Sequence, residues 1–132
     1  MTYLMDTHVW IWWHTAPEKL SSKVSDVIAG LGTNDQLLLS AISIWEVAKL
    51  VEKNKIRLSV GIDQWVAQAL DMHQFQFLPL SPEIAIESTR LPPPFHQDPA
   101  DQIIVASARL FDATLLTVDQ LILDYPHVRT LW

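Results

Sequence analysis

Four acidic residues stand at the edges of apolar segments that lie far apart in the chain: Asp6, Glu46, Asp101 and Asp119. Apolar neighbours hold a carboxylate near the core, where losing water is costly unless the charge is paired. Two like charges about 4 Å apart repel by roughly 4 kcal/mol at an effective dielectric constant of 20. If the fold gathers these four side chains, they must share a proton or bind a cation. A divalent ion with oxygen ligands is the simplest solution.

Short apolar runs alternate with amphipathic segments along the chain. Strands are predicted at residues 3–6, 36–40, 75–80, 113–118 and 128–131. Helices are predicted at residues 21–30, 43–54, 62–73, 82–91 and 119–125, and a further helix is predicted to start at Asp98. Residues 7–15 are predicted as a loop leading into a short helix. This alternation favours an α/β fold with a mostly parallel sheet covered on both faces. Ligands bind beyond the carboxyl ends of such strands, which is where Asp6 and Asp119 fall.

Length, composition and charge narrow the class of protein. At 132 residues the chain is expected to form one domain, and its 49% hydrophobic content argues against disorder. The absence of cysteine excludes disulfides and thiolate metal sites and agrees with a reducing cytosol. No signal peptide or membrane span is expected. A net charge of −6 argues against an ordinary DNA-binding surface but not against a nucleic-acid enzyme, because bound metal ions reverse the local field.

The acidic residues each have a structural alternative to a metal-binding role. Asp6 and Asp119 follow strands and can simply cap the next helix. Glu46 can face solvent and pair with Lys49 on the next turn. Chance is nevertheless a poor explanation for all four positions together. Acids lie at the end of the first strand, in a central helix, at the start of a later helix and at the end of the following strand.

Asp98 and Asp101 lie three residues apart at the start of one predicted helix, where capping and the helix dipole favour acids. We assign the cap to Asp98 and the metal-facing role to Asp101. Thr117, two residues before Asp119, can orient a carboxylate or a water, or merely favour the strand.

Histidines and tryptophans give a weaker signal. The histidines show no helical HxxxH spacing, so a zinc site is not expected. His8 and His96 flank candidate acids and can meet a substrate phosphate, although ordinary polar roles are favoured. Tryptophans can stack on bases, but we expect a core or subunit-interface role for five of them: Trp10, Trp12, Trp13, Trp45 and Trp65.

Four segments together resemble the PIN-domain ribonucleases, and specifically the VapC toxins of toxin–antitoxin pairs. They are LMDTHVWIWW, SAISIWEVAKL, FHQDPADQIIVASA and TLLTVDQLI, in that order, and the similarity spans almost the whole chain. One such motif is weak, whereas four in the right order are specific. The chain departs from many relatives near the third motif, where Gln97 and Gln102 replace arginine and Ala100 replaces an aromatic residue.

The resemblance implies a single PIN domain over residues 1–132, a three-layer α/β/α sandwich around a mostly parallel sheet. It implies endonucleolytic RNA hydrolysis by a metal-activated water, which stops translation in the cytoplasm. It assigns Mg²⁺ or Mn²⁺ to Asp6, Glu46, Asp101 and Asp119, with supporting roles for Asp98, Thr7, Ser43 and Thr117. The expected partners are an RNA substrate, a cognate antitoxin and a second copy of the chain.

Two other classes of protein place acids around a metal ion. A structure-specific DNA nuclease of the flap type needs a substrate arch, for which this chain has no room. A non-enzymatic phosphoacceptor receiver domain needs an early acidic pair and a lysine after a late strand. The only early acid here is Asp6, and no lysine follows Val118.

Overall fold

A computed structural model describes residues 1–71 and 75–132 of the protein. Within those residues, a five-stranded sheet has the order β3-β2-β1-β4-β5, and every pairing is parallel. The strands are β1 (Thr2–Met5), β2 (Gln36–Ser40), β3 (Phe75–Leu78), β4 (Thr114–Leu116) and β5 (Thr130–Leu131). The predicted α/β fold with a parallel sheet is therefore confirmed.

The chain begins at the centre of the sheet and winds outward in both directions. From β1 it moves through β2 to β3 at one edge, then crosses back to β4 and ends with β5 at the other edge. The order of the strands therefore reverses between β1 and β4. Open parallel sheets bind ligands beyond the carboxyl ends of the strands at such a reversal.

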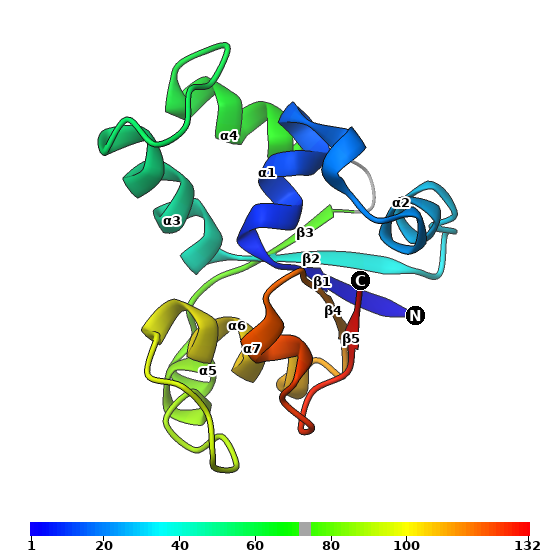
Figure 1. The fold of residues 1–132 in the computed structure, drawn as a ribbon, viewed down its shortest axis with the longest axis vertical. Helices are drawn as coiled ribbons and strands as arrows, with labels where there is room; N and C mark the ends of the chain where they lie inside the picture. The colour runs from blue at the N-terminus through cyan, green and yellow to red at the C-terminus, as the bar shows by residue number, and fades with distance from the viewer. Residues whose placement is uncertain (72–74) are drawn as a thin grey trace.

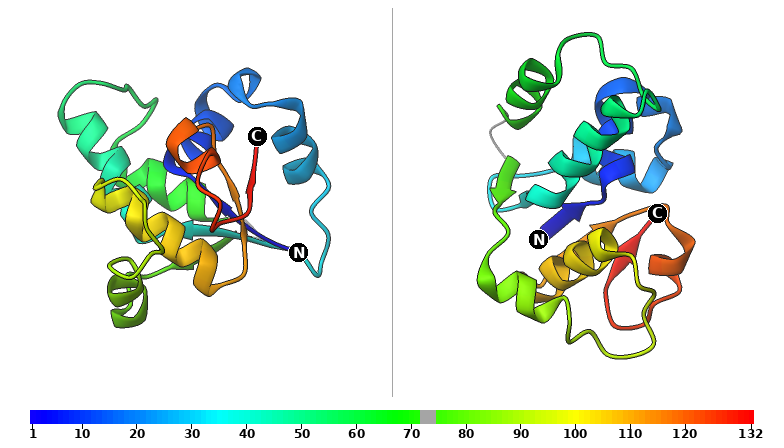
Figure 2. Two further views of the ribbon diagram at one scale, coloured as in Figure 1. Left: turned by 60° about the horizontal axis from the view of Figure 1, so that its bottom comes forward. Right: turned by 90° about the vertical axis from the view of Figure 1, so that its left-hand side faces the viewer.

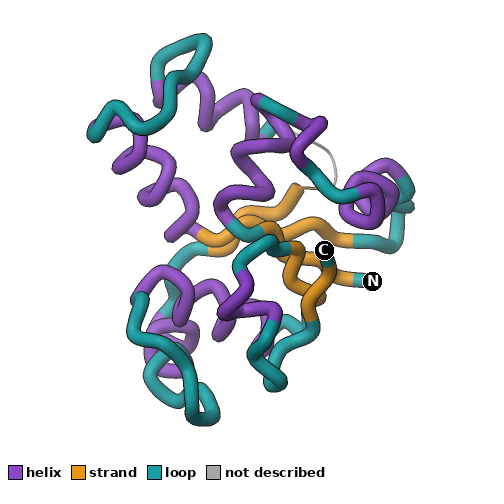
Figure 3. The backbone as a smooth tube through the Cα atoms, in the orientation of Figure 1, coloured by secondary structure: helices purple, strands orange, loops and turns teal. Residues whose placement is uncertain are grey.

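Helices cover both faces of the sheet (Figures 1 and 2), and the tube in Figure 3 shows the same three layers. One face carries α1 (Thr7–Thr15), a 3₁₀ turn η1 (Pro17–Lys19), α2 (Ser22–Ala29), α3 (Ala41–Glu52) and α4 (Ile62–Leu70). The other carries α5 (Pro82–Glu87), α6 (Pro99–Leu110) and α7 (Gln120–Leu123). None of these helices is long and apolar enough to cross a membrane within the part of the chain that the structure describes.

Strand periodicity divides the core between the two faces. Leu4 lies beside Leu38 and Leu115 in register, and all three belong to the cluster that packs under α6 and α7. Met5, the next residue, belongs with Leu39 and Leu116 to the cluster under α1 to α4. Successive strand side chains point to opposite faces, so each central strand must be apolar on both sides.

The prediction of a loop leading into a short helix at residues 7–15 is right about the helix and wrong about the loop, because α1 begins immediately after β1. Asp6 accepts a hydrogen bond from the backbone N of Thr7 and caps the helix directly, so no connecting residues are needed. Several other elements are shorter than predicted, including α5, which ends at Glu87. The last part of the helix predicted at 62–73 lies outside the described residues, and the described helix ends at Leu70.

Candidate active site

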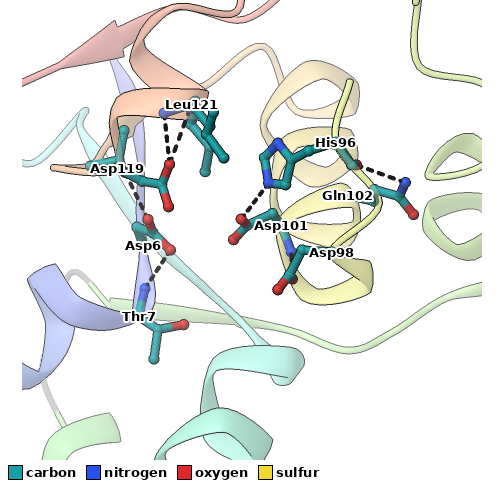
Figure 4. A network of polar contacts seen from close by, with 10 residues as sticks. Asp6, Thr7, His96, Asp98, Asp101, Gln102, Asp119 and Leu121 are labelled. Atoms are coloured by element: carbon teal, nitrogen blue, oxygen red, sulfur yellow. Dashed lines mark hydrogen bonds and ion pairs between the residues drawn. The ribbon is translucent and has the colours of Figure 1, made fainter. Parts of the chain in front are cut away.

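The candidate site lies where the sheet order reverses, beyond the carboxyl ends of β1 and β4. Asp6 follows β1 directly, and Asp119 follows β4 at the start of α7. Figure 4 shows these two side chains on one side of an open space, with Asp98 and Asp101 of the α6 start facing them from the other. Acids from three distant parts of the sequence are thus brought to one end of the sheet by its topology, together with Glu46 of α3.

Asp6 is almost completely buried and is held at both carboxylate oxygens. Its Oδ1 accepts a hydrogen bond from the backbone N of Thr7 at 2.8 Å, and its Oδ2 accepts one from the hydroxyl of Thr117 at 2.7 Å. Only 7% of its surface is exposed. The backbone N of Asp6 also donates to the carbonyl of Leu116 at 3.0 Å, which continues the pairing of β1 with β4 past the strand end. The carboxylate therefore has one orientation.

Thr117 connects Asp6 to Asp119. Its buried hydroxyl donates to Asp6 and accepts a hydrogen bond from the backbone N of Asp119 at 3.0 Å. Asp119 in turn caps α7, accepting from the backbone N of Leu121 at 2.9 Å and that of Ile122 at 3.3 Å. Both cap bonds end on Oδ1, so within the described residues Oδ2 accepts no hydrogen bond and is available to a ligand.

Glu46 is joined to the site through Thr7. The Thr7 hydroxyl donates to Glu46 Oε1 at 2.5 Å, and the buried hydroxyl of Ser43 lies 2.8 Å from the Thr7 oxygen. Because the single hydroxyl proton of Thr7 is given to Glu46, Ser43 must be the donor to Thr7. The alternative pairing of Glu46 with Lys49 is wrong: Lys49 bonds Glu52 at 3.2 Å.

Asp98 caps α6 as predicted, whereas the metal-facing role of Asp101 stays a prediction. Asp98 Oδ1 accepts from the backbone N of Asp101 at 3.0 Å and caps α6. Asp101 Oδ2 bonds the ring Nε2 of His96 at 2.6 Å. That ring packs on the ring of Phe95 with centroids 4.3 Å apart. The backbone carbonyl of His96 accepts a hydrogen bond from the side chain of Gln102 at 3.1 Å. These contacts in the loop before α6 therefore hold the imidazole of His96 against the Asp101 carboxylate.

The pKa values show that these carboxyl groups share one electrostatic environment. Burial first, and then the nearby charges of Asp6, Asp101 and Asp98, raise the pKa of Glu46 to about 7. Burial, with Asp6, Asp98 and Asp119, raises the pKa of Asp101 to about 6 despite the hydrogen bond from His96. Burial and the charge of Asp119 also raise the pKa of Asp6, although both its hydrogen bonds act against this. The protein alone therefore leaves excess negative charge in the site.

A divalent cation fits this donor set. All the candidate ligands are carboxylates, which hard cations prefer, and bound positive charge would offset the cost of holding several negative charges near one another. In residues 1–71 and 75–132, no three acidic or histidine side chains are already grouped closely enough to hold one ion. A cation bound here would therefore require some of the side chains other than Asp6 to rotate.

Asp98 allows its capping role to be measured separately from its charge. We expect Asp98→Ala to unfold more easily than Asp98→Ser by about 1 kcal/mol, because serine can still accept from the backbone N of Asp101 whereas alanine cannot. Both variants lack the charge, so urea denaturation of the pair isolates the cap. Equal unfolding free energies would show that the Asp98 cap contributes nothing to the stability of α6.

The structure places the eight predicted site residues around the same end of the sheet. Asp6, Glu46, Asp101 and Asp119 contribute the carboxylates, and Thr7, Ser43, Thr117 and Asp98 contribute the hydrogen bonds described above. The contact of His96 with Asp101 was not predicted, because a spacing of five residues in a loop has no regular geometry from which a contact follows. The expected core role is right for Trp10 and Trp65, which are buried, whereas Trp45 is exposed.

Sequence comparison finds relatives along nearly the whole chain. The sequence pattern of the PIN domain family matches residues 3–127. Ribonuclease VapC22 of Mycobacterium tuberculosis (strain ATCC 25618 / H37Rv) is 33% identical over 133 residues, which cover 99% of this chain and 98% of that protein.

Solved structures share the fold at lower identity. VapBC2 from Rickettsia felis, bound to a DNA fragment from its promoter, contains a chain with a TM-score of 0.74 and 15% identity, covering 100% of this chain and 99% of that one. A toxin–antitoxin complex from Klebsiella pneumoniae contains one with a TM-score of 0.68 and 21% identity, covering 98% and 96%. At these identities the likeness shows the fold alone.

Proposed function

Because this chain belongs to the PIN-domain family, and within it to the VapC proteins, we propose that it is a divalent-metal-dependent endoribonuclease, the toxin of a toxin–antitoxin pair. The observation that carries the proposal is the group of carboxylates at the sheet reversal, among which Asp6, Glu46 and Asp101 have pKa values raised by burial first and then by the charges of neighbouring acids. Such a group destabilises the protein unless it serves a charged ligand.

Asp6, Glu46, Asp101 and Asp119 would hold one or two Mg²⁺ or Mn²⁺ ions, directly or through water. A divalent cation supplies Lewis acidity, which makes water a better nucleophile near neutral pH and offsets the charge of the phosphodiester. Asp6 contributes a rigid carboxylate, since both its oxygens are fixed by hydrogen bonds. Glu46 contributes Oε2, because Oε1 is occupied by Thr7.

The remaining polar residues hold these carboxylates in place. Thr7 and Ser43 form a buried hydroxyl relay that orients Glu46. Thr117 orients Asp6 and the start of α7. Asp98 caps α6 and thereby fixes the backbone from which Asp101 projects. Hydrogen bonds of this kind preserve the geometry of ligand carboxylates and strengthen cation binding.

The proposed substrate is single-stranded RNA, cut internally so that translation stops in the cytoplasm. The proposed partners are a cognate antitoxin that covers the acidic site and a second copy of this chain. Support comes from the relatives: one is named a ribonuclease, and two chains of the same fold were solved in VapBC or toxin–antitoxin complexes.

The other two classes of protein are not favoured. A receiver domain would need a lysine after a late strand, and the last lysine here is Lys55, before β3. A flap-type DNA nuclease would need a substrate arch, and the connections in the described chain are short. The match to the PIN domain family over residues 3–127 agrees with neither.

Metal removal tests the proposed function directly. We expect the purified protein to cleave a labelled RNA pool with Mg²⁺ or Mn²⁺, to lose this activity in EDTA, and to regain it when the cation is added back in excess. The physical reason is that the carboxylates repel one another and the phosphodiester unless positive charge is supplied. Gel analysis of the fragments gives the readout. Equal cleavage with and without EDTA would refute metal dependence, and no RNA cleavage under any condition would refute the nuclease assignment.

A further inference from the structure

Trp45 is a large side chain left exposed beside the candidate active site. It belongs to α3, directly before Glu46, and 55% of its surface is accessible, whereas Trp10 and Trp65 of the core are 0% and 6% exposed. Removing a ring of this size from water would be favourable, so its exposure suggests a surface that binds something. It is not needed to complete the core, because Ser43 and Val47 provide the buried positions of α3.

Lys49 accompanies the Trp45 ring on the surface of α3. The two residues are four apart, so they are neighbours on the helix surface, and Lys49 is also one turn after Glu46. The Lys49 Nζ lies 5.9 Å from the centre of the Trp45 ring and 3.2 Å from Glu52 Oε1. A cation in contact with an aromatic ring thus lies one helical turn from the carboxylate that we place in the metal site.

Positive charge is concentrated just beyond this point. Four of the nine lysine and arginine residues of the chain fall within residues 49–57, although the whole chain carries −6. They are Lys49, Lys53, Lys55 and Arg57. The last three are exposed, and none of them makes an ion pair within the described part of the chain. The end of α3 and the loop after it therefore form a basic surface that starts beside the acidic site.

We propose that Trp45 and Lys49 form an RNA subsite next to the cleavage position, in which the Trp45 ring stacks on a base and Lys49 meets an adjoining phosphate. Lys53, Lys55 and Arg57 extend the path of the phosphate backbone along the surface. Aromatic rings with nearby cations bind single strands in this way, and stacking tolerates any base. This inference rests on the proposed function, because it concerns the same substrate.

The composition around Trp45 favours RNA over a protein partner. Protein interfaces are enriched in tryptophan, but they are depleted of Lys and Glu relative to the rest of the surface. The Trp45 ring instead lies beside Lys49, which is paired with Glu52 on the same helix. RNA phosphates bind to such cations, whereas a protein partner that excludes water from the interface would have to desolvate these charged side chains.

Binding of a fluorescein-labelled single-stranded RNA of about ten nucleotides, measured by anisotropy, tests this subsite. All variants carry Asp6→Asn so that the RNA stays intact. We expect Trp45→Ala to weaken binding by about fivefold to a hundredfold and Trp45→Phe to restore most of it. Phe111→Ala, which removes a 45% exposed aromatic at the C-terminal end of α6, is the matched control and should bind like its parent. Lys49→Met should lower the slope of log K against log salt by about 0.7.

Unchanged RNA binding by Trp45→Ala would overturn the subsite, as would a shift in oligomeric state by multi-angle light scattering with no loss of RNA affinity. The second result would assign Trp45 to a protein interface. Cleavage by the chain with an intact Asp6 is measured separately. RNA binding that depends on Trp45, without any cleavage, would support the subsite and refute the nuclease function. RNA cleavage together with binding that does not depend on Trp45 would support the nuclease function and refute the subsite.

Discussion

Asp6→Asn is expected to reduce RNA cleavage at least about a hundredfold, which corresponds to roughly 2.7 kcal/mol of transition-state stabilisation. Asp6 is the most buried of the candidate ligands, and both its oxygens are already oriented by Thr7 and Thr117. Asparagine has the same shape and can accept from the Thr7 N, so the cap of α1 survives. It carries no charge, however, and cannot offset a divalent cation.

The measurement is the initial rate of cleavage of a labelled RNA, with saturating Mn²⁺, for protein whose fold is checked by circular dichroism. Asp26→Asn is the charge-matched control, since Asp26 is an exposed residue of α2 on the first face of the sheet. It should retain full activity. An Asp6→Asn protein that is folded and cleaves RNA at the rate of the unsubstituted chain would remove Asp6 from the mechanism.

Glu46→Gln is expected to change activity and stability in opposite directions. Cleavage should fall by at least about tenfold to a hundredfold because a proposed ligand loses its charge. The metal-free protein should nevertheless become more stable near pH 8, by roughly 1–2 kcal/mol after allowance for the partial exposure of the site. Glutamine keeps an oxygen that can accept from the Thr7 hydroxyl, so the relay to Ser43 persists.

The direction of this stability change follows from the raised pKa of Glu46, which is about 7 in the folded protein against an ordinary value of 4.5. Between these values the folded protein binds more protons than the unfolded chain, so the stabilising contribution of protonated Glu46 is lost as pH rises from 4.5 through 7. Below this window, glutamic acid and glutamine are both neutral. The stability advantage of Glu46→Gln should therefore be small near pH 4.5 and largest near pH 8.

Urea denaturation of both proteins in EDTA, at several pH values, gives this difference directly. Comparing the two proteins at each pH cancels the opposing effect of His14, whose pKa is lowered by burial in both. Glu52→Gln removes an exposed charge of the same helix and should show no such pH-dependent gain. A constant or reversed difference between Glu46→Gln and the unsubstituted protein would show that Glu46 is not under electrostatic strain.

Local chemistry explains which features could be predicted from the sequence. The strand at 36–40 and the helix starting at Pro99 were recognisable because an apolar run, a capping acid and a proline act over a few residues. The assignment of the cap to Asp98 followed from the same reasoning and matches its hydrogen bond, whereas the metal-facing role assigned to Asp101 stays a prediction. At residues 7–15 the short helix was predicted correctly, but a loop was wrongly placed before it, because a strand-end acid can cap a helix without a spacer and apolar periodicity does not reveal this.

Neighbouring residues and motif order are enough to predict the alternation of strands and helices, the acids at their edges and the resemblance to PIN-domain proteins. The folded chain was needed to find that Thr7 and Ser43 reach Glu46, that His96 contacts Asp101 and that Trp45 is exposed. Such contacts depend on side-chain directions and on which surfaces the sheet order brings together. Those follow from the packing of the whole chain rather than from any segment of it.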